Sequence, residues 1–248
     1  MKTRRAARMA TLIPTRLLAG ACTAVALLTA APTLASAQDV GYLPDESPYQ
    51  DLAHRQEFTF FTGFYAPSKD PAGVAPTSAP MFGLRYEIRL GGPAQFYVNL
   101  AGSRTDRTVL DPTKGPEDRV LGVQDVNLLM ADLGIGINLT GQKSWHGLVP
   151  TIAGGLGIAS DMTGKDPGTF RLGTPFALSF GGGVKWVSSG RLGLRADVTD
   201  HLFQVRYPDG YYQPPAAGVE PILAPSAKQN VWTHNAALTL GVIYQFGR

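Results

Sequence analysis

Hydrophobic and polar positions alternate with a period of two in eight segments of the chain. Successive side chains of a β-strand point to opposite faces, so this period predicts strands. Most segments have the 9–12 residues that a tilted strand needs to cross a bilayer. The eight predicted strands are 57–65, 82–90, 95–104, 129–140, 148–159, 176–187, 191–199 and 232–246.

The two faces of the predicted strands differ in size and polarity. In 148–159, Leu148, Ile152 and Leu156 share one face, and Thr151 and Gly155 lie on the other. A soluble β-sandwich also alternates, but it keeps its bulky side chains inside. Bulky apolar residues on one face and small or charged ones on the other are typical of a membrane barrel, whose bulky face meets lipid.

The connections between the predicted strands alternate between long and short. The long ones are 66–80, 105–123, 160–174 and 200–230, and the short ones are 91–93, 140–147 and 188–190. Outer-membrane barrels have short periplasmic turns and long outer loops. The sequence therefore predicts an all-β fold, an eight-stranded antiparallel up-and-down transmembrane β-barrel, with both termini on the periplasmic side.

The N-terminal segment has the features of a cleaved signal peptide, predicted to span 1–37. Basic residues precede an apolar stretch over 17–31, and Ala35-Ser36-Ala37 forms a small-residue cleavage site. The mature chain would start at Gln38, and 38–56 would form a polar periplasmic lead-in before the barrel domain at 57–248.

Two other interpretations of this leader stay open. A membrane anchor is disfavoured because the apolar run is short and Pro32 interrupts it. Lipidation at Cys22 is disfavoured because Ala19 stands where a lipoprotein signal carries Leu.

Removing the leader changes the charge balance of the protein. The chain has 22 basic and 19 acidic residues, and the leader holds five of the basic ones, so the mature chain has 17 against 19 and a net charge of −2. The sequence therefore predicts no nucleic-acid partner. Cys22 is the only cysteine and leaves with the leader, which predicts a mature protein without disulfides.

The last predicted strand resembles the C-terminal assembly signal of outer-membrane barrels. Its marked positions are Thr239, Gly241, Tyr244 and Phe246. Together with the leader and the loop pattern, the segment 57–248 resembles the small OmpA/OmpX-type outer-membrane barrels. The resemblance implies export to the outer membrane, contact with outer-membrane lipid and insertion by the barrel-assembly machinery.

Charged residues of both signs fall on the face predicted to line the lumen. Eight strands leave an interior just wide enough for side chains to fill it, and charges there are costly unless they pair. We expect Arg85, Arg89 and Arg195 to face Glu87, Asp132 and Asp197. The predicted ion-pair network comprises Glu57, Arg85, Glu87, Arg89, Asp132, Lys185, Arg195 and Asp197. A structural plug is favoured over a gated ion path.

The aromatic residues and the loops suggest contacts outside the lumen. Interfacial girdles are predicted from Phe58, Tyr65, Tyr86, Phe96, Trp186, Trp232, Tyr244 and Phe246. The loop 200–230, with Tyr207, Tyr211 and Tyr212, is expected to contact an unknown extracellular ligand. The protein is expected to be a monomer.

Catalysis, cofactors and metals are not expected. The histidines are His54, His146, His201 and His234. Some barrels that deacylate lipid carry a His followed by Ser two residues later, but Ala236 stands at that place after His234. The acidic loop residues Asp106, Asp111, Glu117 and Asp118 lack calcium-loop spacing. The sequence thus predicts a non-enzymatic structural or surface-interaction barrel. A narrow channel for small solutes and a lipid-A-modifying enzyme are the alternatives.

Overall fold

The computed structural model describes residues 46–163 and 169–247. The predicted leader, Cys22 and the start of the lead-in lie outside the described residues. In the part described, no helix is both long and apolar enough to span a membrane. The strands are β1 (Tyr49–Asp51), β2 (Gln56–Pro67), β3 (Ala79–Gly91), β4 (Ala94–Leu110), β5 (Val120–Asn138), β6 (Lys143–Trp145), β7 (Leu148–Asp161), β8 (Phe176–Val187), β9 (Leu192–Arg206) and β10 (Asn230–Phe246).

Eight of these strands close into an antiparallel barrel. Its strands follow one another in the order β2, β3, β4, β5, β7, β8, β9 and β10, and β10 pairs with β2 to close the ring. Each strand of the ring therefore neighbours the strands before and after it in the sequence. The predicted eight-stranded up-and-down barrel is confirmed.

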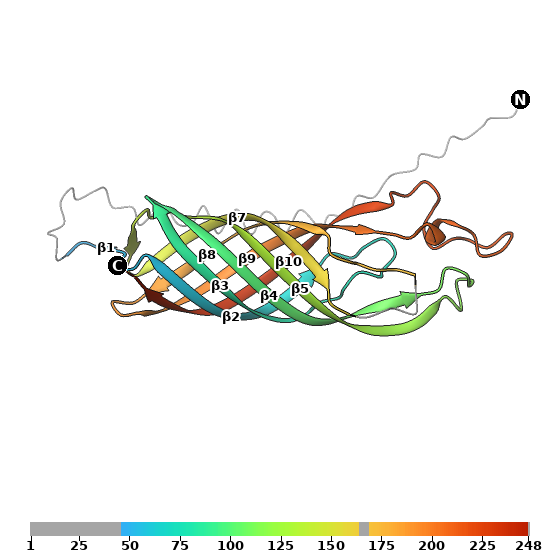
Figure 1. Cartoon of the computed structure of the whole chain (residues 1–248), viewed down its shortest axis with the longest axis horizontal. Coiled ribbons are helices and arrows are strands. Elements are labelled where there is room, and N and C mark those ends of the chain that lie inside the picture. Colours follow the sequence, from blue (N-terminus) through green and yellow to red (C-terminus); the bar gives the residue numbers. More distant parts are fainter. Residues whose placement is uncertain (1–45, 164–168, 248) are drawn as a thin grey trace, which may run out of the picture. The chain divides into compact units, whose positions relative to one another are not determined.

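The two ends of the barrel differ. Strand β1 and the C-terminal residues lie at one end, which we call the terminal end (Figure 1). The tip of the β4–β5 hairpin and the short 3-10 helix η2 (Asp209–Tyr212) lie at the other, the loop end. This separation of termini and long loops agrees with the alternation of loop lengths in the sequence.

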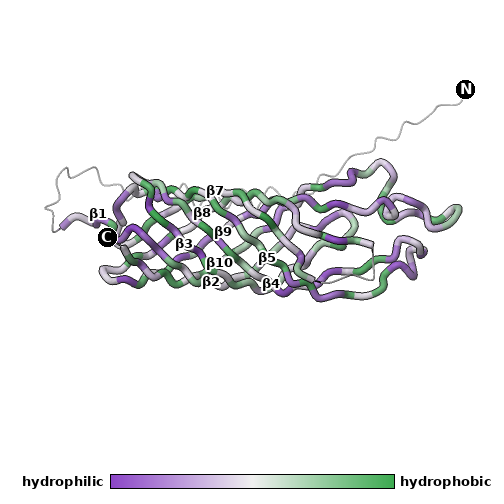
Figure 2. The backbone as a smooth tube through the Cα atoms, in the orientation of Figure 1, coloured by the Kyte–Doolittle hydropathy of each residue, from purple (hydrophilic) through white to green (hydrophobic). Residues whose placement is uncertain are grey.

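The polarity of the barrel wall inverts along its length. Over most of the wall, exposed apolar residues alternate with buried positions that are often polar. Figure 2 shows the corresponding mixture of hydrophobic and hydrophilic residues along the strands. Exposed members of this belt include Phe60, Phe64, Phe82, Leu100, Leu133, Leu156, Phe180, Leu194 and Leu240. Toward the loop end the pattern reverses: Arg104 and Asp125 point outward, whereas Val126 and Leu128 are buried inside. The apolar belt is what a lipid environment requires, and the reversed section is what water requires.

This inversion explains why three strands are longer than the sequence predicts. Strands β4, β5 and β9 continue into 105–110, 120–128 and 200–206. Of these, 105–110, 120–123 and 200–206 were expected to be loops, and 124–128 had no predicted structure. The predicted strands depended on an apolar outward face. In the extended parts several outward residues, such as Asp106, Asp125 and Asn127, are polar, whereas Val120, Leu121 and Val123 near the hairpin tip are exposed apolar residues. The regular apolar pattern is thus lost although the backbone pairing of Arg104 with Asn127 and Arg107 with Gln124 continues.

The lead-in also contains regular structure. Strand β1 pairs with β6, which lies in the turn between β5 and β7 that was predicted as 140–147. The amide of Leu52 donates to the carbonyl of Gln142 at 2.9 Å, and the amide of Arg55 donates to the carbonyl of Gly247 at 3.0 Å. Because β7 and β2 lie on opposite sides of the ring, residues 49–55 cross the terminal end of the barrel.

Candidate functional site: the closed lumen

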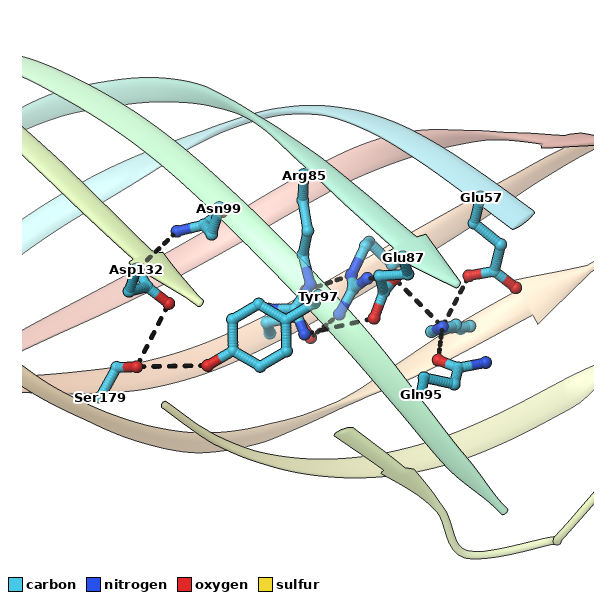
Figure 3. A network of polar contacts seen from close by, with 11 residues as sticks. Glu57, Arg85, Glu87, Gln95, Tyr97, Asn99, Asp132 and Ser179 are labelled. Carbon is cyan, nitrogen blue, oxygen red and sulfur yellow. Dashed lines mark hydrogen bonds and ion pairs between the residues drawn. The ribbon is translucent and has the colours of Figure 1, made fainter. Parts of the chain in front are cut away.

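A buried ion-pair network fills the lumen toward the terminal end (Figure 3). Nζ of Lys185 on β8 lies 2.6 Å from Oε2 of Glu57 on β2 and 3.1 Å from Oε2 of Glu87 on β3. Arg195 on β9 contacts the same Glu87 oxygen. The network thus joins strands from opposite sides of the barrel wall.

The remaining contacts complete the pairing of charges. Arg195 Nε lies 2.6 Å from Asp197 Oδ2, and Arg85 Nη2 lies 3.2 Å from Glu87 Oε1. Three cations, Arg85, Lys185 and Arg195, face three carboxylates, Glu57, Glu87 and Asp197. A neutral, fully paired cluster limits the desolvation cost that buried charges otherwise incur.

Neutral polar groups extend the network at both sides. Lys185 Nζ donates to Gln95 Oε1 at 2.8 Å, and the Gln245 amide donates to Glu57 Oε1 at 3.1 Å. Gln95 and Gln245 therefore supply hydrogen bonds that the carboxylate and ammonium would otherwise take from water. Neither glutamine belonged to the predicted network, although Gln95 lies on the same face of β4 as the buried Asn99.

Asp132 lies in a separate branch of the network. It was expected to face an arginine, but it accepts hydrogen bonds from Asn99 Nδ2 at 3.0 Å and from Ser179 Oγ at 3.2 Å. Ser179 also contacts the Tyr97 hydroxyl at 3.2 Å, and the Arg85 guanidinium lies over the Tyr97 ring, 3.8 Å from its centroid. The bulk of Tyr97 separates Asp132 from the cations, which the linear sequence could not reveal.

Arg89 is also placed differently from the prediction. Its side chain does not join the carboxylates but donates to the carbonyls of Leu52 at 3.1 Å and His54 at 2.7 Å. The prediction missed this contact because the lead-in was treated as a structureless segment. Arg89 instead fastens residues 49–55 across the terminal end.

The space left in the lumen is small. A cavity of about 30 Å³ lies beside Tyr97, Asn99, Asp132 and His201. One water needs about 10–15 Å³ of such volume, so this cavity has room for about two or three waters at most.

An apolar core closes the barrel at the loop end. Phe61 and Met130 from the wall share a buried cluster with loop residues Val74, Phe170 and Tyr207. The Arg107 guanidinium lies above the Phe170 ring, 5.3 Å from its centroid. Two clusters of side chains thus occupy the barrel interior, a charged one toward the terminal end and an apolar one at the loop end.

Three tyrosines differ from their predicted roles. Tyr207 and Tyr211 were expected to contact an extracellular ligand, but both are fully buried in the apolar core, and only Tyr212 keeps part of its side chain in solvent. Tyr65 was expected in an interfacial girdle, but it points inward, where its hydroxyl donates to Asn235 Oδ1 at 2.8 Å. Tyr65 lies an even number of positions from the inward Glu57 on β2, so the alternation of the strand indicated an inward side chain.

Asp70 organises the loop that follows β2. The amides of Val74 and Ala75 donate to its carboxylate at 3.3 and 3.0 Å, and the Tyr207 hydroxyl donates to it at 2.8 Å. Burial and the neighbouring Asp70 carboxylate raise the pKa of the Tyr207 phenol. Tyr207 therefore remains a hydrogen-bond donor and ties two outer loops together.

The residues of the predicted assembly signal lie on β10, which closes the barrel. Gly241 allows close packing because a Cβ there would lie 2.7 Å from Thr59 Cγ2, and Thr239 lines the small cavity. Tyr244 stacks on Phe246 with 6.0 Å between ring centroids. Both aromatics lie at the terminal end, as do Phe58, Tyr86 and Trp186, whereas Trp232 lies toward the loop end.

The histidines and acidic loop residues are dispersed. His54 lies in the lead-in, His146 follows β6, and His201 is buried inside the barrel. His234 points outward and contacts Asp200, with Nδ1 to Oδ2 at 2.6 Å. Asp106 lies in β4, and Asp111, Glu117 and Asp118 lie around the hairpin tip. Within residues 46–163 and 169–247, no three His, Cys, Asp or Glu side chains gather as metal ligands.

No known protein-family model matches the sequence, and no curated protein matches it. Several solved structures are similar. Neisserial surface protein A (NspA) is 16% identical with a TM-score of 0.46, covering 77% of this chain and 97% of that one. The outer membrane protein OprG from Pseudomonas aeruginosa is 14% identical with a TM-score of 0.49, covering 79% and 98%.

The N-terminal β-barrel domain of Pseudomonas aeruginosa OprF is 11% identical with a TM-score of 0.42, covering 77% of this chain and 98% of that one. At these identities and TM-scores the similarities carry no argument about this chain, whose own strand pairing carries the fold assignment.

Proposed function

We propose that this protein is a sealed outer-membrane barrel with a structural or surface-interaction role, and that its lumen transports nothing. The observation that carries the proposal is the contact of Lys185 with both Glu57 and Glu87 across the lumen. A solute path would have to break these ion pairs, whose loss in a low-dielectric interior is costly.

The two other closures support the same role. Residues 49–55 cross the terminal end and are held by Arg89. At the loop end, Tyr207 and Tyr211 are buried with Phe170 in the apolar core. A solute would therefore meet three successive barriers.

The polarity of the wall supports insertion in the outer membrane with the loop end outside. The outward belt, including Leu133 and Leu240, would contact lipid, and the polar β4–β5 extension would stand in water. Assembly by the barrel-assembly machinery would read the terminal strand β10. This role needs no catalysis, cofactor or metal in the lumen, and a monomer satisfies all strand pairing.

The surface available to an extracellular partner is narrower than the loop lengths suggest. The hairpin tip around 111–119 and the segment 213–229 remain exposed, and Arg119 Nη2 joins them by donating to the Glu220 carbonyl at 2.9 Å. We propose that a partner of the cell surface contacts these two segments together.

Conductance of the full chain in planar lipid bilayers tests the sealed lumen. We expect no stable current steps above those of protein-free bilayers at either sign of voltage. Variants Lys185→Ala and Lys143→Ala form a matched pair, because Lys185 is buried in the network and Lys143 is exposed. Steps in the unmodified protein that change only in Lys185→Ala would replace this proposal with the narrow channel.

A further inference from the structure

Three polar residues come together on the outward wall where β2, β10 and β9 adjoin: Ser68, His234 and Asp200. The His234 side chain is 67% exposed, and that of Asp200 is 21% exposed. Leu238, Ala236 and His234 share the outward face of β10. Along this face, Leu238 lies toward the apolar belt and His234 lies toward the loop end. The three residues thus lie at the boundary where the apolar belt gives way to polar wall.

His234 is oriented by Asp200. Nδ1 of His234 lies 2.6 Å from Asp200 Oδ2, and the other carboxylate oxygen, Oδ1, accepts the backbone amide of Asn235 at 2.8 Å. The carboxylate is therefore fixed by two contacts. With Nδ1 donating to a carboxylate, Nε2 of the neutral imidazole keeps its lone pair and can accept a proton.

Ser68 lies on the other side of His234. Its backbone amide donates to the His234 carbonyl at 2.7 Å, directly after the paired residues Pro67 and Asn235. Ser68 and His234 are thus cross-strand neighbours, both exposed, and such pairs have Cβ atoms about 5 Å apart. With the His234 ring held by Asp200, the proposed site requires a Ser68 rotamer whose Oγ points toward His234 Nε2.

The backbone around Ser68 is held in place. Asp70, two residues later, binds the amides of Val74 and Ala75 and the hydroxyl of Tyr207. His234 and Asp200 therefore come from the paired strands β10 and β9, and Ser68 directly follows β2, held there by its amide contact with His234. A site on rigid elements keeps its geometry better than one on free loops.

From this geometry we propose that Ser68, His234 and Asp200 form a hydrolytic site for acyl esters of lipids at the outer boundary of the membrane. Ser68 Oγ attacks the ester carbonyl while its proton passes to His234 Nε2. The tetrahedral adduct collapses, the C–O bond to the alcohol breaks, and the alcohol leaves with the proton from His234. Water, deprotonated by His234, then attacks the acyl–Ser68 carbonyl. The bond between the acyl carbon and Ser68 Oγ breaks, Oγ takes the proton back from His234, and a fatty acid is released.

This site goes beyond the proposed role of the barrel and does not depend on the lumen. The sequence predicted no enzyme because Ala236 occupies the position two residues after His234, where a nucleophilic serine would stand on the same strand. Strand pairing supplies Ser68 from β2, 166 positions before His234 in the chain, and no local motif can show this.

The test uses the full chain folded in detergent micelles, with a fluorophosphonate as serine probe and p-nitrophenyl palmitate as ester. We expect covalent labelling at Ser68, located by peptide mass spectrometry, and ester hydrolysis above protein-free micelles. Ser68→Ala should abolish labelling. Ser68→Ala, His234→Ala and Asp200→Asn should each lower hydrolysis at least ~100-fold.

Ser78→Ala is the matched control, because Ser78 is an exposed serine of the same outer loop. It should label and hydrolyse like the unmodified protein. Ser68 and His234 are exposed, and Asp200→Asn keeps an oxygen that can accept the Asn235 amide. Retention of the folded, heat-modifiable form on gels shows that the barrel is intact in each variant. Absence of labelling at Ser68, or absence of hydrolysis by the unmodified protein, overturns the site and leaves the sealed-lumen proposal untouched.

Discussion

Lys185 Nζ and Glu57 Oε2 lie 2.6 Å apart, although two strands, β9 and β10, separate their own strands in the barrel wall. Both side chains are almost fully buried. The pair therefore spans the lumen, whereas a pair on adjacent strands would lie along the wall without crossing the interior. This single contact links the stability of the barrel to the closure of its interior.

Replacing Lys185 with Met should destabilise the barrel strongly. The change keeps the length of the side chain but leaves Glu57 with only Gln245 and removes one cation from Glu87. Leaving buried charge uncompensated costs about 3–5 kcal/mol. Urea unfolding in phospholipid vesicles measures the loss. Lys143→Met is the control, since its pair with Asp51 is exposed and worth no more than about 1 kcal/mol. Equal effects of the two changes would contradict the network.

Arg89→Ala should release the lead-in while the barrel stays folded. The guanidinium holds the carbonyls of Leu52 and His54, and hydrogen bonds to a charged group contribute about 1.5–3 kcal/mol. Amide hydrogen exchange over 49–55 should accelerate by about tenfold or more. Arg55→Ala, at an exposed neighbouring position, should leave the exchange unchanged. Unaltered exchange in Arg89→Ala would show that the β1–β6 pairing alone fixes the segment.

Tyr207→Phe should loosen the loop end. The substitution removes the donor to Asp70 from a fully buried site, and an unmade buried hydrogen bond costs about 1–3 kcal/mol. Hydrogen exchange at the amides of Val74 and Ala75 should rise. Tyr212→Phe removes a comparable hydrogen bond to the Lys228 carbonyl at an exposed position, and its effect should be much smaller. If the two variants behave alike, Tyr207 does not tie the loops.

Gly134→Ala should impair barrel folding. A Cβ at Gly134 would lie 2.6 Å from the Cα of Gly155 and 2.8 Å from the Tyr97 hydroxyl. Backbone cannot yield as a flexible side chain does, so the strand pair would have to separate. Gly102→Ala is the matched change, since its Cβ would touch only the Phe82 ring at 3.9 Å. The folded fraction after refolding into micelles distinguishes the two, and equal yields would refute the expectation.

The sequence by itself determined the barrel, the strand count and the sidedness of the loops. The period-two alternation of the sequence predicts strands correctly because each strand has one lipid-facing and one lumen-facing side. For the same reason, strand parity placed Glu57, Glu87, Lys185 and Arg195 inside before any contact was known. A local sequence pattern is sufficient to predict which face of a strand a residue lies on, because this depends only on the residue and its nearest neighbours in the chain.

Only the tertiary structure decided which of these residues meet. Arg89 binds the lead-in, Asp132 binds Asn99 and Ser179, and Tyr207 is buried beside Asp70. Beyond the membrane, water replaces lipid as the surroundings of the wall, so the hydrophobic pattern inverts. The alternation with an apolar outward face therefore does not predict the strands there. Ser68 and His234 become neighbours through strand closure alone. Contacts across a closed barrel depend on register and curvature, which no short segment of sequence contains.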